Sequence, residues 1–456
     1  MSEFTELKEE VLATAEQALK YVHDLSIPSA EIFVVKRSTT EVKSSKGKVE
    51  TRDGIVKGVG IRVAVGKRVG FSSCTSFNSD LIRSTLIEAF NIAKSSPENP
   101  RFPGFASSSK PGKDGLLDPD VISLDGEILG KQVTTLEKEC VSVDERILGA
   151  EIEASADWGA FAVGTTEGVL EATLNTVHAV VVSALAFDKG ERSGSFEVLL
   201  GRKAQDITGL GEKAAKNALK HLGSKPLGKA EVITTVWHPI TAGMLYAYAF
   251  ALGFNGGEAC EKRNPLGTKL NEQIGTEGLT LIDDAQDPEK ITTYAIDTEG
   301  VGTRNTTIVE KGVLKTFLFD RLYGETFGVG STGNADRMGH TPFEEIPRIM
   351  PHKIIFAPGT KNLEKQIEEC ERAIYIEGNL MGIGHANYFT GDFSITATNA
   401  YLIEHGEIVR PLAPLSIAGN FYKSLKQIKT IGSDIIPNFN PVDAPTLTIE
   451  GLSISG

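Results

Sequence analysis

The chain has 456 residues, which is too long for one ordinary core, so two or three domains are expected. Hydrophobic residues make up 40% and charged residues 23%, a balance typical of globular proteins. The formal charge of −13 argues against a general nucleic-acid-binding surface, which needs a basic field. The longest apolar stretch, residues 244–254, is far shorter than the roughly 20 residues of a membrane span.

Cysteine usage and the N-terminus bear on location. The four cysteines are far apart and form neither a zinc ribbon nor a disulfide framework, so ordinary reduced thiols are expected. The acidic N-terminus lacks the apolar core of a signal peptide. We therefore expect a cytoplasmic protein that contacts neither nucleic acid nor membrane.

The first half alternates between helical and strand periodicity. Apolar residues at three- and four-residue intervals predict helices, and alternation predicts strands in a meander with Gly-containing turns. The predicted helices cover residues 3–25, 79–95, 128–145 and 204–222, and the predicted strands lie within 30–73, 177–187 and 196–200. Residues 97–120, rich in Pro, Gly, Ser and Lys, predict an exposed connection.

The second half begins near Glu231. Residues 232–236 predict a strand, and Pro239 suits the start of a helix that runs to Phe254. That helix is apolar nearly all round, which predicts burial. Short strands with glycine turns follow, interrupted by one clear helix at residues 363–373.

This order of elements predicts the α+β class. We expect an N-terminal helix and β-meander domain over residues 1–225. A β-rich C-terminal domain with a buried central helix should cover residues 226–456.

The start of the central helix raises the main chemical question. A zinc peptidase helix needs two imidazoles on one face and a Glu beside the first to activate water. His238 is the first such imidazole, but Pro239 takes the place of the Glu, and Ala242 and Gly243 take both positions for a second imidazole. One histidine cannot hold zinc, so neither catalytic residues nor a metal site is predicted. The ordinary interpretation is that the His238 side chain hydrogen-bonds the first turn.

Other polar residues leave an alternative open. His340 and His385 lie in Gly-rich loops, and loops converge in space, so a cluster of both with His238 remains an alternative metal site. Asp297 and Glu299 precede a glycine and are interpreted as turn residues rather than as an acid pair.

Six short segments of the second half, in this order, resemble the signature of the TldD/TldE (PmbA) peptidase family. The segments are residues 297–301, 308–314, 331–335, 390–394, 401–408 and 416–420. The early helix and β-meander also fit, so the resemblance spans nearly the whole chain.

The resemblance implies a choice between two kinds of subunit. TldD-type members carry H-E-x-x-x-H on the central helix and a Cys ligand near the C-terminus, whereas TldE-type members lack both. This chain is similar to the TldE-type members in two respects. Its helix has His238, Pro239 and Gly243 at the motif positions, and its tail at residues 432–456 contains no Cys. This implies no cofactor here, with zinc expected only in a TldD-type partner. The partnership is a heterodimer, or a homodimer when this chain is isolated.

The family processes small peptides, which implies an extended peptide as substrate. A β-rich wall can hold such a peptide as an added strand. The candidate chamber residues are His340, Gly384, His385, Asn387, Gly391 and Asp392, with plain structural turns as the alternative interpretation.

Two other functions stay open. One is a self-sufficient peptidase with a non-standard site built from scattered histidines. The other is a regulatory binding protein, as the family's older name "modulator of DNA gyrase" suggests.

Overall fold

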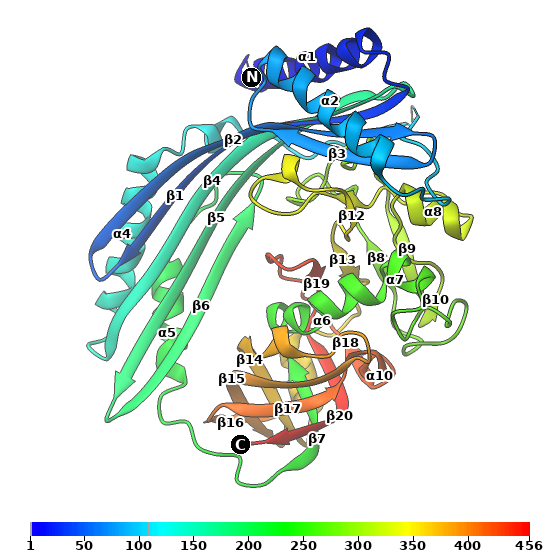
Figure 1. The fold of residues 1–456 in the computed structure, drawn as a ribbon. Helices are drawn as coiled ribbons and strands as arrows, with labels where there is room; N and C mark the ends of the chain where they lie inside the picture. Colours follow the sequence, from blue (N-terminus) through cyan, green and yellow to red (C-terminus); the bar gives the residue numbers. More distant parts are fainter. Residues whose placement is uncertain (1, 108–109) are drawn as a thin grey trace.

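The first half of the chain forms a single antiparallel sheet in the order β3-β2-β1-β4-β5-β6, seen in the computed structural model, which describes residues 2–107 and 110–456. Several strands are long, and the sheet curves around the second half (Figure 1). The strands are β1 (Ser29–Ser45), β2 (Lys48–Val65), β3 (Arg68–Cys74), β4 (Ile147–Thr165), β5 (Leu170–Asp188) and β6 (Glu191–Gly201).

Helices cover the outer face of this sheet in two groups (Figure 1). One core joins β1 and β2 to the first two long helices, and a second joins β4 and β5 to the later pair. The helices are α1 (Ser2–Asp24), α2 (Ser79–Ser95), the short α3 (Pro119–Ile122), α4 (Gly126–Ser142) and α5 (Leu210–Lys220).

Alternation explains the first core. Ile32 and Val34 on β1 lie beside Ile61 and Val59 on β2, and all four side chains are fully buried. Successive strand residues point to opposite faces, so this register places one apolar row under α1 and α2.

The second half contains a closed ring of five strands. The pairing runs β14-β7-β20-β17-β15, and β15 pairs again with β14, which leaves no open edge in the ring. The strands are β7 (Glu231–Trp237), β14 (Arg372–Met381), β15 (Asp392–Glu404), β17 (Leu415–Asn420) and β20 (Leu447–Ser455), with β16 (Glu407–Leu412) beside β15 and β18 (Ile428–Ile431) beside β20.

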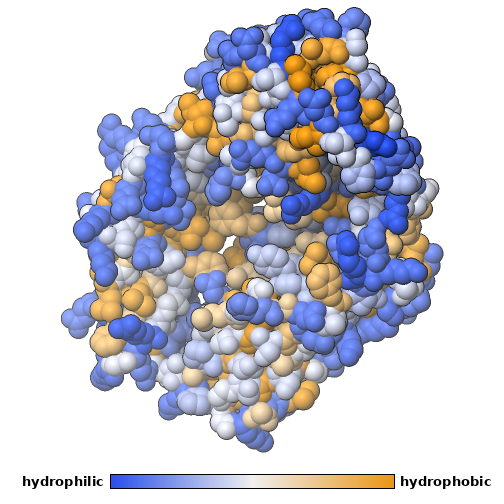
Figure 2. Space-filling model, in the orientation of Figure 1, coloured by the Kyte–Doolittle hydropathy of each residue, from blue (hydrophilic) through white to orange (hydrophobic). Residues whose placement is uncertain are grey.

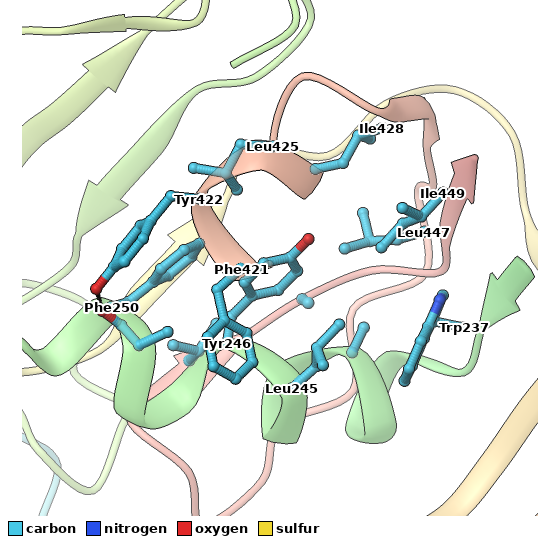
Figure 3. Packing of buried hydrophobic residues seen from close by; sticks show 14 of the residues in the cluster. Trp237, Leu245, Tyr246, Phe250, Phe421, Tyr422, Leu425, Ile428, Leu447 and Ile449 are labelled. Atoms are coloured by element: carbon cyan, nitrogen blue, oxygen red, sulfur yellow. Dashed lines mark hydrogen bonds between the residues drawn. The ribbon is translucent and has the colours of Figure 1, made fainter. Parts of the chain in front are cut away.

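A second sheet, in the order β10-β9-β8-β13-β19, lies beside the ring. Helix α6 (Pro239–Gly253) shares one core with residues of both. Figure 3 shows its Leu245, Tyr246 and Phe250 packed against residues of α10 and β20. The strands of this sheet are β8 (Leu281–Asp283), β9 (Thr306–Glu310), β10 (Val313–Leu314), β13 (Ile354–Phe356) and β19 (Val442–Asp443).

Short elements complete the second half. They are α7 (Gly256–Cys260), α8 (Arg321–Phe327), β11 (Ala335–Asp336), η1 (Pro342–Glu344), β12 (Arg348–Ile349), α9 (Leu363–Glu368), η2 (Ile383–His385) and α10 (Phe421–Ser424). The helix predicted at residues 363–373 is therefore too long. It ends at Glu368 because Arg372 already pairs with Glu404 in the β14–β15 ladder.

The α+β class and the β-rich second half with a buried helix are confirmed. No helix within the described residues is long and apolar enough to cross a membrane. The cytoplasmic location and the domain limits at residues 225 and 226 stay predictions.

The sequence predicted an exposed connection over residues 97–120, but part of this segment is buried. Phe102, Phe105 and Ala106 are buried, and the two rings pack edge to face 5.3 Å apart. Further along, the Gly112 amide donates to the Ala295 carbonyl over 2.7 Å. The glycines and prolines let this strap follow the surface of the second half while its aromatic residues contribute to a core.

A buried ionic cluster joins the two halves. Glu31 on β1 accepts hydrogen bonds from Arg62 Nε (2.8 Å) and Arg337 Nη2 (2.7 Å). Arg62 Nη2 also reaches Glu299 at 2.9 Å, and the side chains of Glu31 and Arg337 are fully buried. Burial disfavours the charged form of Arg62, but Glu31 and Glu299 outweigh it and raise the pKa of the guanidinium.

We expect Glu31→Ala to destabilise the protein by about 3–5 kcal/mol, because it leaves two buried guanidinium groups without their shared carboxylate. Lys36→Ala on the same strand is the matched control, since Lys36 pairs with Glu10 near the surface and its loss should cost less than about 1 kcal/mol. Denaturant unfolding of both variants measures the loss in the free energy of unfolding. Equal losses would contradict the assignment of the ionic cluster as the main contact that holds the halves together.

Candidate functional site

The start of α6 is where a zinc-binding helix would present its ligands. His238 is the N-cap residue, and its carbonyl accepts the Ala242 amide over 2.8 Å. Its side chain makes no capping hydrogen bond, so the prediction that the imidazole bonds the first turn is wrong. Burial lowers the pKa of the His238 ring, which favours the neutral form.

Gly243, one turn further, is sealed by the segment that leads into β19. A Cβ atom at this position would lie 2.6 Å from the Val442 carbonyl oxygen and 3.2 Å from Asn438 Nδ2. Side-chain carbons do not approach that closely, so only glycine fits without a shift of the backbone. The helix position that would need a second imidazole therefore has no room for one.

The histidines of the alternative metal site are not brought together. His340 is exposed in the β11–β12 hairpin, where its carbonyl faces Arg37 of the first half at 3.4 Å. His385 is exposed in η2, beside the ring of strands. Over residues 2–107 and 110–456, no group of three or more His, Cys, Asp or Glu side chains is placed to hold a metal ion.

Four of the six predicted chamber residues lie in the loop between β14 and β15, and a fifth, Asp392, is the first residue of β15. Asn387 Oδ1 accepts the amides of Phe389 and Thr390, both at 3.1 Å. Gly391 has a φ of +85°, and a Cβ there would meet the Tyr422 ring at 2.4 Å. Asp392 accepts Asn420 Nδ2 at 2.8 Å. These contacts give the loop a fixed shape.

The remaining members of the predicted set, Gly384 and His385, are exposed. Neither of the two cavities described below is lined by these loop residues or by His340. Their assignment to a peptide chamber stays a prediction.

The turn at residues 297–301 is structural, as interpreted, but it is buried rather than exposed. The Asp297 carboxylate accepts the amides of Glu299, Val301 and Ala335 at 2.9, 2.9 and 3.1 Å. Burial and the nearby Glu299 raise the pKa of Asp297 well above its ordinary value. This family segment therefore positions Glu299 for the ionic cluster.

A cavity of about 870 Å³ lies between the large sheet and the ring of strands. Space-filling atoms leave the centre of the molecule hollowed between the two halves (Figure 2). The walls of this cavity come from the lower ends of β4, β5 and β6, from the end of α5 and from the β14–β15 pair. The wall residues include Gly194, His221, Gly378 and Asn399.

A second cavity, of about 330 Å³, lies next to the buried ionic cluster between the halves. Arg37, Asp336 and His352 contribute to its walls. Its volume is at the lower end of the range of typical ligand sites, whereas that of the larger cavity is near the upper end.

Sequence reasoning missed the residues of the larger cavity. Asn399 lines the cavity, and Tyr401 contacts the wall residue His221. Both are polar side chains at buried positions of β15, and this mismatch with strand alternation was the available signal. His221, at the end of α5, carried no signal because its partners are 178 and 180 residues away in the chain.

Comparison with known proteins defines the class of protein to which this fold belongs. The descriptions "PmbA/TldA metallopeptidase domain 1", "central domain" and "C-terminal domain" match residues 30–95, 120–222 and 230–456. The structure of TldE from Thermococcus kodakarensis superimposes with a TM-score of 0.86 at 22% identity, over 97% of this chain and 99% of that one. The fold is that of a metallopeptidase family.

The chain belongs to the PmbA/TldD family. It is 25% identical to "Metalloprotease PmbA homolog" of Haemophilus influenzae, over 96% of each chain. It is 24% identical to "Metalloprotease PmbA" of Escherichia coli O157:H7, over 94% of this chain and 92% of the relative.

Gly243→Ala should destabilise the protein by about 1–3 kcal/mol, because the added methyl group meets the Val442 carbonyl. The matched control is Gly130→Ala in α4, where a Cβ meets open space and alanine should stabilise the helix by up to about 1 kcal/mol. Thermal and denaturant unfolding give the sign of each change, and stabilisation by both would contradict the sealed helix face.

Asp320 predicts a pH dependence of stability. Burial and the nearby Glu299 raise its pKa from 3.8 to about 7, so the folded state holds a proton that the unfolded state releases. This stabilisation is complete below about pH 4 and is lost as the pH rises through 7. Asp320→Asn keeps a cap for the Tyr323 amide, and we expect it to lose less stability than wild type between pH 5 and pH 8. Parallel losses in denaturant unfolding at the two pH values would count against it.

Proposed function

We propose that this chain is a TldE-like subunit that holds an extended peptide while a TldD-type partner supplies zinc and cleaves it. The observation that carries the proposal is the sealed face of α6, where Gly243 lies against the Val442 carbonyl and His238 has no second imidazole beside it. Family membership supports a role in peptide processing.

An unpaired strand edge supports peptide holding. β6 is the outermost strand of the large sheet, and the Gly194 carbonyl on its outer side accepts Asn399 Nδ2 at 2.9 Å. Because the hydrogen-bonding direction of the backbone repeats every second residue along a strand, the backbone groups of Arg192 and Phe196 point to the same outer side as that of Gly194. All three residues line the larger cavity. A peptide can add there as a further strand, through backbone hydrogen bonds that are indifferent to its side chains.

The partner is needed for chemistry because one imidazole gives zinc too few ligands, and structural or catalytic zinc takes at least three from protein. The unequal subunits then divide the work, with binding on this chain and water activation on the other. The partner forms a heterodimer with this chain, which self-associates when isolated.

We expect the purified chain alone to leave an unstructured peptide intact, and a mixture with a TldD-type partner to cleave it in a chelator-sensitive way. His238→Asn in this chain should leave cleavage by the mixture within about twofold of wild type, since asparagine suits an N-cap and the ring carries no metal. Peptide hydrolysis followed by mass spectrometry measures both. Chelator-sensitive hydrolysis by the chain alone, abolished by that substitution, would falsify the proposal in favour of a self-sufficient peptidase.

A further inference from the structure

One buried histidine in the larger cavity has a ring nitrogen without a hydrogen-bond partner. His221 is 5% exposed and lines the cavity, and its Nε2 makes no hydrogen bond. Its other nitrogen, Nδ1, lies 3.2 Å from the Asn217 carbonyl and 3.2 Å from the Tyr401 hydroxyl. An unsatisfied buried polar atom is unfavourable, so a group that hydrogen-bonds this nitrogen would bind with that advantage.

The ring proton belongs on Nδ1. We assign it there because the Asn217 carbonyl, 3.2 Å away, can only accept a hydrogen bond, and it lies closer to Nδ1 than the Asn399 amide nitrogen does at 3.4 Å. Burial lowers the pKa of His221, which keeps the ring neutral near pH 7. The Nε2 atom then carries a lone pair and is an acceptor.

A second acceptor faces this lone pair. Glu377 Oε1 lies 3.6 Å from His221 Nε2, and the Glu377 side chain is 24% exposed. Burial and the Glu377 carboxylate raise the pKa of the Tyr375 and Tyr401 hydroxyls, so both stay protonated and act as donors toward that carboxylate. The carboxylate oxygen therefore faces the imidazole nitrogen as a second hydrogen-bond acceptor.

Two acceptors 3.6 Å apart both lie within about 2.9 Å of one donor atom placed between them, and a positive charge on that donor strengthens both bonds. A metal ion is a poor candidate, because no group of three His, Cys, Asp or Glu side chains is assembled among the described residues. A primary ammonium group has three N–H donors and the required charge.

We propose that the pair His221–Glu377 binds a primary alkylammonium group of the peptide, either its N-terminal amine or a lysine side chain, in the cavity between β6 and the β14–β15 pair. This inference rests on the proposed function, since it assumes that the ligand is a peptide. The cavity volume of about 870 Å³ has room for several residues behind the amine.

Calorimetric titration of the isolated chain tests the site with three probes: trialanine, N-acetyl-trialanine, and N-acetyl-alanyl-lysyl-alanine. Acetylation removes the charge and two donors, so it should weaken binding of trialanine by about tenfold or more. Restored binding of the lysine probe assigns the site to a side-chain amine, and its failure to bind assigns it to the N-terminal amine.

Two variants locate the site. His221→Phe keeps a ring against Tyr401, 4.5 Å away between centroids, and removes the nitrogen. Glu377→Gln removes the charge. Each should weaken the amine probe about tenfold and leave the acetylated probe unchanged. His405→Asn is the matched control, because His405 forms an exposed pair with Glu371 and asparagine tolerates its φ of +52°.

The inference is overturned if the free and acetylated peptides bind equally, if no probe binds, or if the control weakens binding as much as His221→Phe in proteins of equal thermal stability. Equal binding would indicate that only a water bridges the pair. In each case, the proposed function is tested by a separate measurement, which is chelator-sensitive cleavage by the mixture with a TldD-type partner. The failure of one proposal can therefore be distinguished from the failure of the other.

Discussion

The buried carboxylate of Glu31 is the contact on which the arrangement of the two halves depends. It binds Arg62 from the first half and Arg337 from the second, and Arg62 extends the cluster to Glu299. Charges this deep in a protein are tolerated only when they are paired and hydrogen-bonded, so the halves are held in one relative position. That position places β6 opposite the β14–β15 pair and thereby creates the larger cavity.

Helix α6 is the element in which a metal-dependent peptidase would be expected to present its metal ligands. The segment around Asn438 and Val442 packs directly on Gly243 of this helix, so the space beside that residue is filled. An imidazole at position 243 would therefore require the chain near β19 to move.

Local pattern predicted much of the fold. The period of the apolar residues predicted α1 and α2, because each buries a face that its own sequence marks, whereas Pro239 and a nearly continuous apolar composition predicted α6. Residues 97–120 were misjudged because their composition is that of a loop, while Phe102 and Phe105 are buried by contacts distant in sequence. The site was harder still. His221, Glu377 and Asn399 come from three separate elements, and only the interface between the halves brings them together.

The strap over residues 97–120 has a consequence for access. Because it crosses from α2 to the second half and is bonded there through Gly112 and Leu116, a clamshell opening of the halves would strip it from Ala295 and Pro288 as well as break the Glu31 cluster. Access to the cavity by such an opening would therefore require the strap contacts and the ionic cluster to break together.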